Sequence, residues 1–178
     1  MNKLNNKVKI IGGLWKRKDI FFSEEEGLRP TLGRVRETLF NWLNQDLSDR
    51  ICLDLFSGSG ALGFESLSRN SKTTYMVEKN KHIYQVLVKN KEQLQSNNAV
   101  IINATAENFV IQNDVYFDII FFDPPFNYKN QLLLLLSLKK YLKADGLIYY
   151  ETDSKYVETD FKIIKSSHAG KVYFYLLQ

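Results

Sequence analysis

The chain has 178 residues, of which 44% are hydrophobic, and a net charge of +4, which is typical of one globular domain with a small extension. No apolar stretch is long enough to cross a bilayer, and residues 1–10 lack the apolar core of a signal peptide, so we expect no membrane anchor and no secretion signal. The single cysteine, Cys52, cannot form an intramolecular disulfide, and we expect a buried thiol in a reducing, cytoplasmic setting.

The positive charge is concentrated near the N-terminus. Residues 1–36 contain nine Lys or Arg and four acidic residues, a net charge of +5, whereas the remaining 15 basic and 16 acidic residues sum to −1. A modest basic cluster can be a solvated surface or a nucleic-acid-binding face. The charge alone leaves both interpretations open.

Residues 1–45 are predicted to form an N-terminal extension that consists of a β-hairpin and a helix. The hairpin turns at the Gly-Gly pair at 12–13, and three basic residues follow the turn: Lys16, Arg17 and Lys18.

The helix of this extension is expected to be capped by Thr31 and to end near Asn44, because apolar residues recur at helical spacing between them. Arg34 and Arg36 lie off this apolar face and near the start of the helix, where cations oppose the helix dipole. That conflict favours a binding role for the two arginines.

From residue 46 onward, strands alternate with helices. Strands are expected at 51–56, 73–78, 99–104, 117–123 and 147–152, and helices at 60–69, 81–95, near 106–112, and at 131–143. The segments 161–167 and 171–177 form a closing antiparallel hairpin. This order predicts a doubly wound, mostly parallel Rossmann-like α/β sheet with an antiparallel C-terminal strand, over residues 46–178.

A glycine-rich turn follows the first of these strands. Gly58, Gly60 and Gly63 have the G-x-G-x-x-G spacing of a dinucleotide site, so an NAD-linked oxidoreductase is one alternative. Asp54, however, ends the preceding strand, where a carboxylate would repel a pyrophosphate and attract an ammonium group. Glu78 ends the next strand and can accept the two hydroxyl groups of a ribose. An amino acid, a ribose and a base in one pocket describe S-adenosylmethionine.

The fourth strand ends in the sequence Asp-Pro-Pro-Phe at 123–126. Asp123 and the carbonyl of Pro124 can accept the two N–H groups of an exocyclic amine, while Pro124 and Pro125 stiffen the loop. Phe126 can stack on a nucleobase, a contact of about 1–3 kcal/mol. Oriented in this way, the nitrogen lone pair faces the sulfonium methyl group, and no metal is needed.

These motifs, in this order, resemble the amino-methylating class I methyltransferases. The longer set, IIGGLWKRK, GLRPTLGRVRETLFNWL, DLFSGSGALGFESLSR, VEKN and DPPF, resembles the RsmD family of bacterial 16S rRNA guanine-N2 methyltransferases over nearly the whole chain. The resemblance implies a catalytic set of Asp123, Pro124, Pro125 and Phe126. It implies S-adenosyl-L-methionine binding by Asp54, Phe56, Gly58, Gly60, Glu78, Lys79, Thr105 and Ala106.

The resemblance also implies RNA contacts and a partner. The implied RNA-binding residues are Lys16, Arg17, Lys18, Arg29, Thr31, Arg34 and Arg36, with Thr31 and the two arginines after it closing one side of the pocket or meeting RNA. The implied partner is 16S rRNA within a small-subunit particle, and the implied state is a monomer without metal. Thr105 stands where the family often has Asp or Asn, which leaves the backbone N–H of Ala106 to reach the adenine.

Two further alternatives share this fold. One is an amino methyltransferase that acts on adenine or cytosine of another nucleic acid, although 178 residues leave no room for a separate target-recognition domain. The other is a non-catalytic RNA-binding assembly factor, which the intact Asp123 disfavours.

Overall fold

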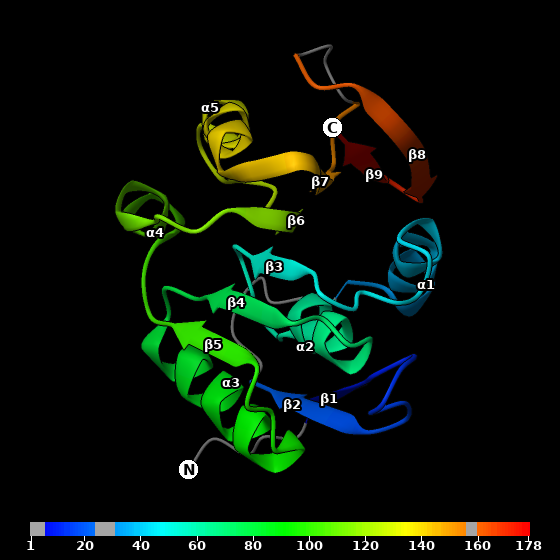
Figure 1. The fold of residues 1–178 in the computed structure, drawn as a ribbon, viewed down its shortest axis with the longest axis vertical. Helices are drawn as coiled ribbons and strands as arrows, with labels where there is room; N and C mark the ends of the chain where they lie inside the picture. The colour runs from blue at the N-terminus through cyan, green and yellow to red at the C-terminus, as the bar shows by residue number, and fades with distance from the viewer. Residues whose placement is uncertain (1–5, 24–30, 156–159) are drawn as a thin grey trace.

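The computed structural model describes residues 6–23, 31–155 and 160–178. A seven-stranded sheet has the order β5-β4-β3-β6-β7-β9-β8 (Figure 1), and a separate hairpin pairs β1 with β2. The strands are β1 Asn6–Lys9, β2 Asp19–Phe22, β3 Ile51–Asp54, β4 Thr73–Val77, β5 Ala99–Ile102, β6 Phe117–Phe122, β7 Leu142–Thr152, β8 Ile163–Ala169 and β9 Val172–Leu177. The helices are α1 Gly33–Trp42, α2 Ala61–Ser68, α3 Lys81–Leu94, α4 Ala106–Gln112, α5 Gln131–Leu138 and the short 3₁₀ helix η1 Lys139–Tyr141.

The five strands β5, β4, β3, β6 and β7 are parallel, and β9 and β8 complete the sheet in antiparallel pairing. Every residue of β6 is buried, which is why its sequence FDIIFF is nearly continuous in apolar residues rather than alternating. The expected doubly wound sheet with an antiparallel C-terminal edge is therefore confirmed.

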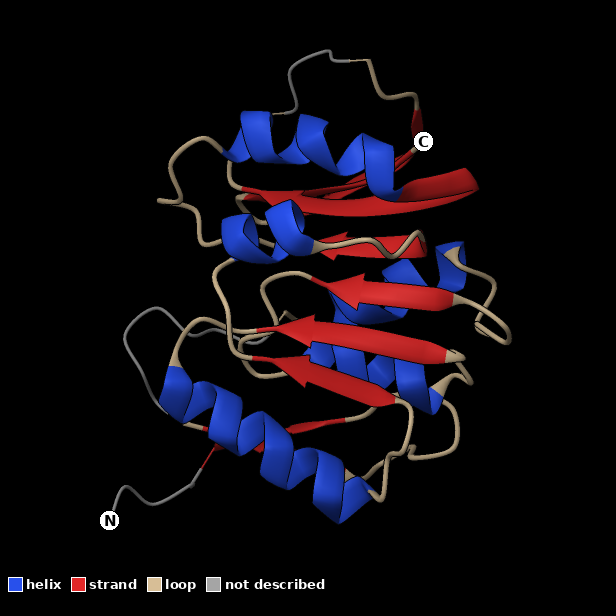
Figure 2. Cartoon of the chain, turned by 60° about the vertical axis from the view of Figure 1, so that its left-hand side comes forward, coloured by secondary structure: helices blue, strands red, loops and turns tan. Residues whose placement is uncertain are grey.

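Helices cover both faces of the sheet (Figure 2). Helices α4 and α5 pack their apolar residues on one face, together with side chains of β3, β6 and β7. On the other face, α1 packs against β3, β6, β7 and β9, while α2 and α3 pack against β4 and the N-terminal hairpin. This face carries the N-terminal extension, so the extension and the sheet share one hydrophobic core. The division of the chain at residue 45 stays a prediction.

Two predicted element boundaries are wrong. The leucine-rich helix ends at Leu138, and β7 already begins at Leu142, so the segment Ala144–Gly146 lies inside the strand instead of stopping the helix. The helix of the extension begins at Gly33 with Leu32 at the cap position and no side-chain cap. Thr31 does not cap it because its hydroxyl group binds elsewhere, as described below.

Cys52 lies in the middle of β3 and is fully buried. Burial and then the charge of Asp118 raise the pKa of its thiol to about 12. The thiol is therefore an unreactive core group in the native state. Among the described residues, no helix is long and apolar enough to span a membrane.

Candidate active site

The site lies at the point where the strand order of the sheet reverses. The chain passes from β3 outward to β4 and β5, and it then returns to β6 on the other side of β3. Loops after β3 and β6 diverge at this point, and open α/β sheets bind ligands in the crevice between them. Asp54 is the last residue of β3 and pairs with Phe121, so Asp54 and Asp123 lie on adjacent strands at the same end of the sheet.

The glycine loop joins β3 to α2. Gly60 has a φ of 78° and occupies the cap position of α2, and a Cβ atom there would lie 2.7 Å from the ring of Phe64. Only glycine fits this position without displacing the core. The loop thereby brings backbone N–H groups at the start of α2 to the crevice, where they can face a ligand.

Glu78 follows β4 and connects the glycine loop to the next loop. Its carboxylate accepts hydrogen bonds from the backbone N–H of Gly58 at 3.1 Å and of Asn80 at 2.8 Å. Burial raises the pKa of Glu78, and these backbone hydrogen bonds oppose the shift. A carboxylate has about four acceptor positions, so two remain for the hydroxyl groups of a ribose.

Asp54 is 2% exposed and accepts a hydrogen bond from the backbone N–H of Gly63 in α2 at 3.0 Å. Burial raises the pKa of Asp54 to about 7, the Gly63 hydrogen bond opposes this, and the charge of Glu78 adds to it. A cationic ligand beside Asp54 would favour its ionised form. The carboxylate thus anchors α2 and retains acceptor capacity toward the crevice.

Asp123 lies directly after β6 and accepts a hydrogen bond from the hydroxyl group of Thr31 at 3.0 Å. Burial and then the charge of Glu151 raise the pKa of Asp123. Pro124 is buried, whereas Phe126 is 47% exposed. An exposed aromatic residue three positions beyond a partly buried carboxyl group can stack on a flat ligand that Asp123 holds by its edge.

Two other predicted cofactor residues, Phe56 and Thr105, already have contacts within the protein. Phe56 packs edge-on against Tyr128, with ring centroids 5.0 Å apart, and Tyr128 donates a hydrogen bond to Glu107. Thr105 caps α4 by accepting a hydrogen bond from the backbone N–H of Asn108 at 3.2 Å. This use of the Thr105 side chain disfavours a role for it in adenine binding.

Lys79 is exposed immediately after Glu78, and Ala106 is the buried first residue of α4. The assignment of cofactor contacts to these two residues stays a prediction.

The predicted RNA-binding residues differ in their exposure to solvent. Lys16, Arg17 and Lys18, here called the basic turn, are exposed at the end of the N-terminal hairpin, and Arg34 is exposed on α1. Arg29 lies outside the described residues. Thr31 is buried and faces Asp123 rather than solvent.

The prediction that Arg36 contacts RNA is wrong. Arg36 is only 3% exposed, and its guanidinium group donates to the backbone carbonyl of Lys9 at 3.1 Å and pairs with Glu65 at 3.3 Å. Its charge is neutralised inside the protein and is not available to a phosphate group.

Comparison with known proteins identifies the family of this chain. The model of the family described as Conserved hypothetical protein 95 matches residues 8–178. The chain belongs to this family. Ribosomal RNA small subunit methyltransferase D of Haemophilus influenzae is 39% identical over 96% of this chain and 93% of that protein. The enzyme of the same name from Escherichia coli K12 is 37% identical over 98% of this chain and 91% of its own length.

A solved structure is also similar to this chain over nearly its whole length. The protein yhhF from Escherichia coli has a TM-score of 0.87 and 36% identity, and the match covers 97% of this chain and 98% of that one. The resemblance to the RsmD family, and with it the predicted enzyme class, is confirmed.

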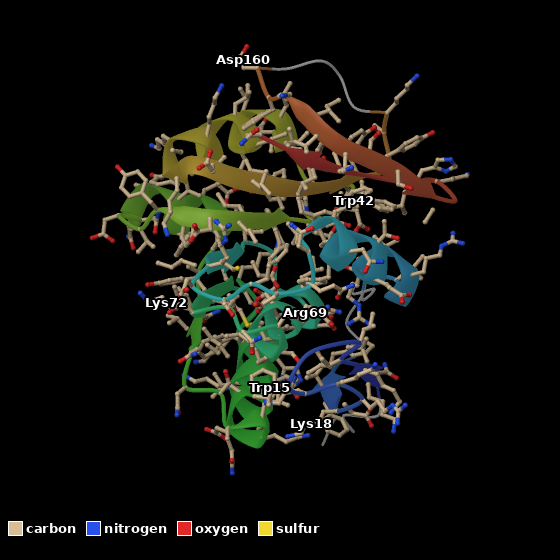
Figure 3. The ribbon with its side chains drawn as sticks, turned by 45° about the vertical axis from the view of Figure 1, so that its right-hand side comes forward. Trp15, Lys18, Trp42, Arg69, Lys72 and Asp160 are labelled. Carbon is tan, nitrogen blue, oxygen red and sulfur yellow. The ribbon has the colours of Figure 1, made fainter. Side chains whose placement is uncertain are left out.

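Glu65, a buried residue that the sequence motifs did not single out, connects the site to the extension. Glu65 of α2 is fully buried and accepts hydrogen bonds from the backbone N–H groups of Ile11 and Gly12, both at 2.8 Å. It also pairs with Arg36 and, at 2.9 Å, with Arg69. These five groups are here called the Glu65 clamp (Arg69 is labelled in Figure 3).

The Glu65 clamp is reinforced by the next turn of α2. The Ser68 hydroxyl donates to the carbonyl of Gly12 at 2.6 Å and accepts from the N–H of Trp15 at 2.9 Å. A Cβ atom on Gly13 would lie 1.8 Å from the Ser68 carbonyl oxygen. The Gly-Gly turn is thus held against α2, which fixes the place of the basic turn next to it.

Within the described residues, no group of three or more His, Cys, Asp or Glu could hold a metal ion.

Proposed function

We propose that this protein transfers the methyl group of S-adenosylmethionine to the exocyclic 2-amino group of a guanine in 16S rRNA. The observation that carries the proposal is the position of Asp123: it follows β6 at the switch point of the sheet and is followed by Pro124, Pro125 and the exposed Phe126. The two relatives named as small-subunit rRNA methyltransferases support the same substrate. We take the substrate to be rRNA within a small-subunit particle, which a monomer approaches through its N-terminal face.

The cofactor would lie across the carboxyl ends of β3 and β4. Glu78 would accept the ribose hydroxyl groups, Asp54 would attract the ammonium group, and the N–H groups near Gly58 and Gly60 would face the amino-acid end. S-adenosylmethionine carries its own leaving group, so the chain has to supply positions and charges rather than a nucleophile.

The base would lie beside β6. Asp123 would accept one N–H of the amino group, the Pro124 carbonyl would accept the other, and the ring of Phe126 would stack on the base. A new C–N bond forms as the C–S bond breaks, its electron pair stays on sulfur, and the nitrogen then loses one proton. The carboxylate stabilises the positive charge that develops on nitrogen.

The decisive experiment uses S-adenosylmethionine with a labelled methyl group. The protein is incubated with small subunits that lack the modification, and in parallel with protein-free 16S rRNA, and the labelled nucleoside is identified. We expect label on N2 of guanine, with the particle as the better substrate. Label on adenine or cytosine would support the alternative amino methyltransferase, and RNA binding without any label would support the assembly factor.

The basic turn is expected to supply part of the RNA affinity. Replacing its three residues by glutamine should weaken RNA binding and reduce the slope of log K against log salt by about 2, because each phosphate contact contributes roughly 0.7–0.9. Binding of S-adenosylmethionine, measured by calorimetry, should not change.

A matched control replaces three exposed lysines on or next to the C-terminal strands β8 and β9, Lys162, Lys165 and Lys171. This control removes the same formal charge and should affect the slope less. Equal slopes for both triple variants would show that the basic turn is only a solvated surface.

A further inference from the structure

A second carboxyl group lies beside Asp123, at the end of β7. Phe122 of β6 pairs with Tyr150 of β7, so Asp123 and Glu151 are the next pair along the two parallel strands. Adjacent strands are about 4.8 Å apart, and side chains at paired positions point to the same face of a sheet. Glu151 is 8% exposed. Two acidic side chains, one partly buried and one buried, therefore lie next to each other.

A hydroxyl group holds each of these carboxyl groups. Thr31 donates to Asp123 at 3.0 Å, and Tyr149 donates to Glu151 at 2.6 Å. Tyr149 is itself fully buried, so its hydroxyl group has a fixed place. In the part of the chain that the structure describes, neither carboxyl group forms an ion pair with a basic side chain. The hydrogen bonds orient the pair without neutralising it.

Among the residues that the structure describes, the groups named below add negative charge to the pair or none. Asp54 at the end of β3 acts on Asp123 as a further negative charge. Phe174 of β9, which pairs with Glu151 on the other side, is uncharged. Burial raises the pKa of both carboxyl groups, and the charge of Glu151 raises that of Asp123 further, while the Tyr149 hydrogen bond lowers that of Glu151. Two adjacent carboxylates with limited access to water cannot both ionise easily, and such a pair holds one proton in common.

We propose, resting on the function proposed above, that Glu151 is a positioning residue that shares one proton with Asp123, and that this pair receives the proton which the guanine amino group loses. The methylated nitrogen releases its proton to a carboxylate oxygen of Asp123, and the N–H bonding electrons remain on nitrogen. The pair, which carried one negative charge, becomes neutral and later gives one proton to water. Glu151 acts through Asp123 and does not touch the base.

The test is the pH profile of a single methyl-transfer turnover with saturating cofactor and RNA. In the wild type, the rate should fall on the acidic side as the pair becomes fully protonated. Glu151→Gln removes the carboxyl group that shares the proton, and with it the stabilisation of the singly charged pair. The pKa at which Asp123 becomes protonated should therefore rise, and this acidic limb should move to higher pH. Dissociation constants for RNA and cofactor should change less than about twofold, because neither ligand touches Glu151.

Tyr149→Phe should shift the limb in the same direction through a different contact, and it guards against a folding defect in the first variant. It keeps both carboxyl groups and removes only the hydroxyl group that favours ionised Glu151, so the acidic limb should move to higher pH. An acidic limb that stays at the wild-type pH in both folded variants would overturn the proposal and leave Glu151 a structural residue. A wild-type protein that does not methylate RNA would instead overturn the proposed function.

Discussion

Asp123→Ala is expected to reduce methyl transfer by at least about 100-fold, because the amino group loses the acceptor that orients its lone pair toward the sulfonium. The change should leave the fold intact, since Asp123 lies at the end of β6 rather than inside a hydrophobic cluster. Cofactor affinity should also persist, because Asp54 and Glu78 belong to other strands. Single-turnover transfer of labelled methyl, with calorimetry of cofactor binding, measures both quantities.

Asp123→Asn separates geometry from charge. The amide oxygen can still accept from the Thr31 hydroxyl, but the charge that would stabilise the developing cation is lost. Activity intermediate between the wild type and Asp123→Ala would assign part of the effect to hydrogen-bond geometry. If Asp123→Ala methylates guanine at the wild-type rate, Asp-Pro-Pro-Phe is only a turn and the base site lies elsewhere.

Glu65→Ala is expected to destabilise the protein by about 3–5 kcal/mol, the usual cost of leaving buried charges uncompensated. Arg36 and Arg69, which are 3% and 5% exposed, would both lose the carboxylate they share. Two backbone N–H groups of the Gly-Gly turn would lose their acceptor as well. Urea denaturation measures the free energy of unfolding, and hydrogen exchange of residues 10–18 shows whether the hairpin separates from α2 before the sheet unfolds.

Asp19→Ala is the matched control for Glu65→Ala. Asp19 of β2 also pairs with two basic side chains, Lys7 at 3.0 Å and Lys9 at 2.9 Å, but these lysines are exposed. Pairs of this kind contribute little in water, so the urea midpoint should remain close to that of the wild type. Equal midpoints for the two variants would show that burial of Glu65 does not make its ion pairs essential.

The sequence was informative where a motif and a strand end coincide. Asp54, Glu78 and Asp123 were predicted at the carboxyl ends of three strands, and parallel pairing in the observed order brings these ends to one edge of the sheet. Such placement follows from local pattern and the rules of βαβ connection alone.

Errors arose where a distant residue decides the environment. Thr31 has the chemistry of a helix cap, but its hydroxyl group instead donates a hydrogen bond to Asp123, far along the chain. Arg36 was expected at the surface because it lies off the apolar face of α1, yet Glu65 of α2 gives it a buried partner. No local signal marks such a pair, since a glutamate and an arginine on two helices are usually exposed.

The burial of Cys52 makes the rate of its chemical modification a measure of how often the core opens. Only a thiolate reacts with a thiol reagent. In the native protein the Cys52 thiol is buried in the core and has a pKa of about 12. The single sulfhydryl group therefore becomes reactive only when the side chains of α1 and α2 that pack over it in the core move away from β3. The rate of its modification reports how often the centre of the molecule opens, and no other cysteine contributes to that signal.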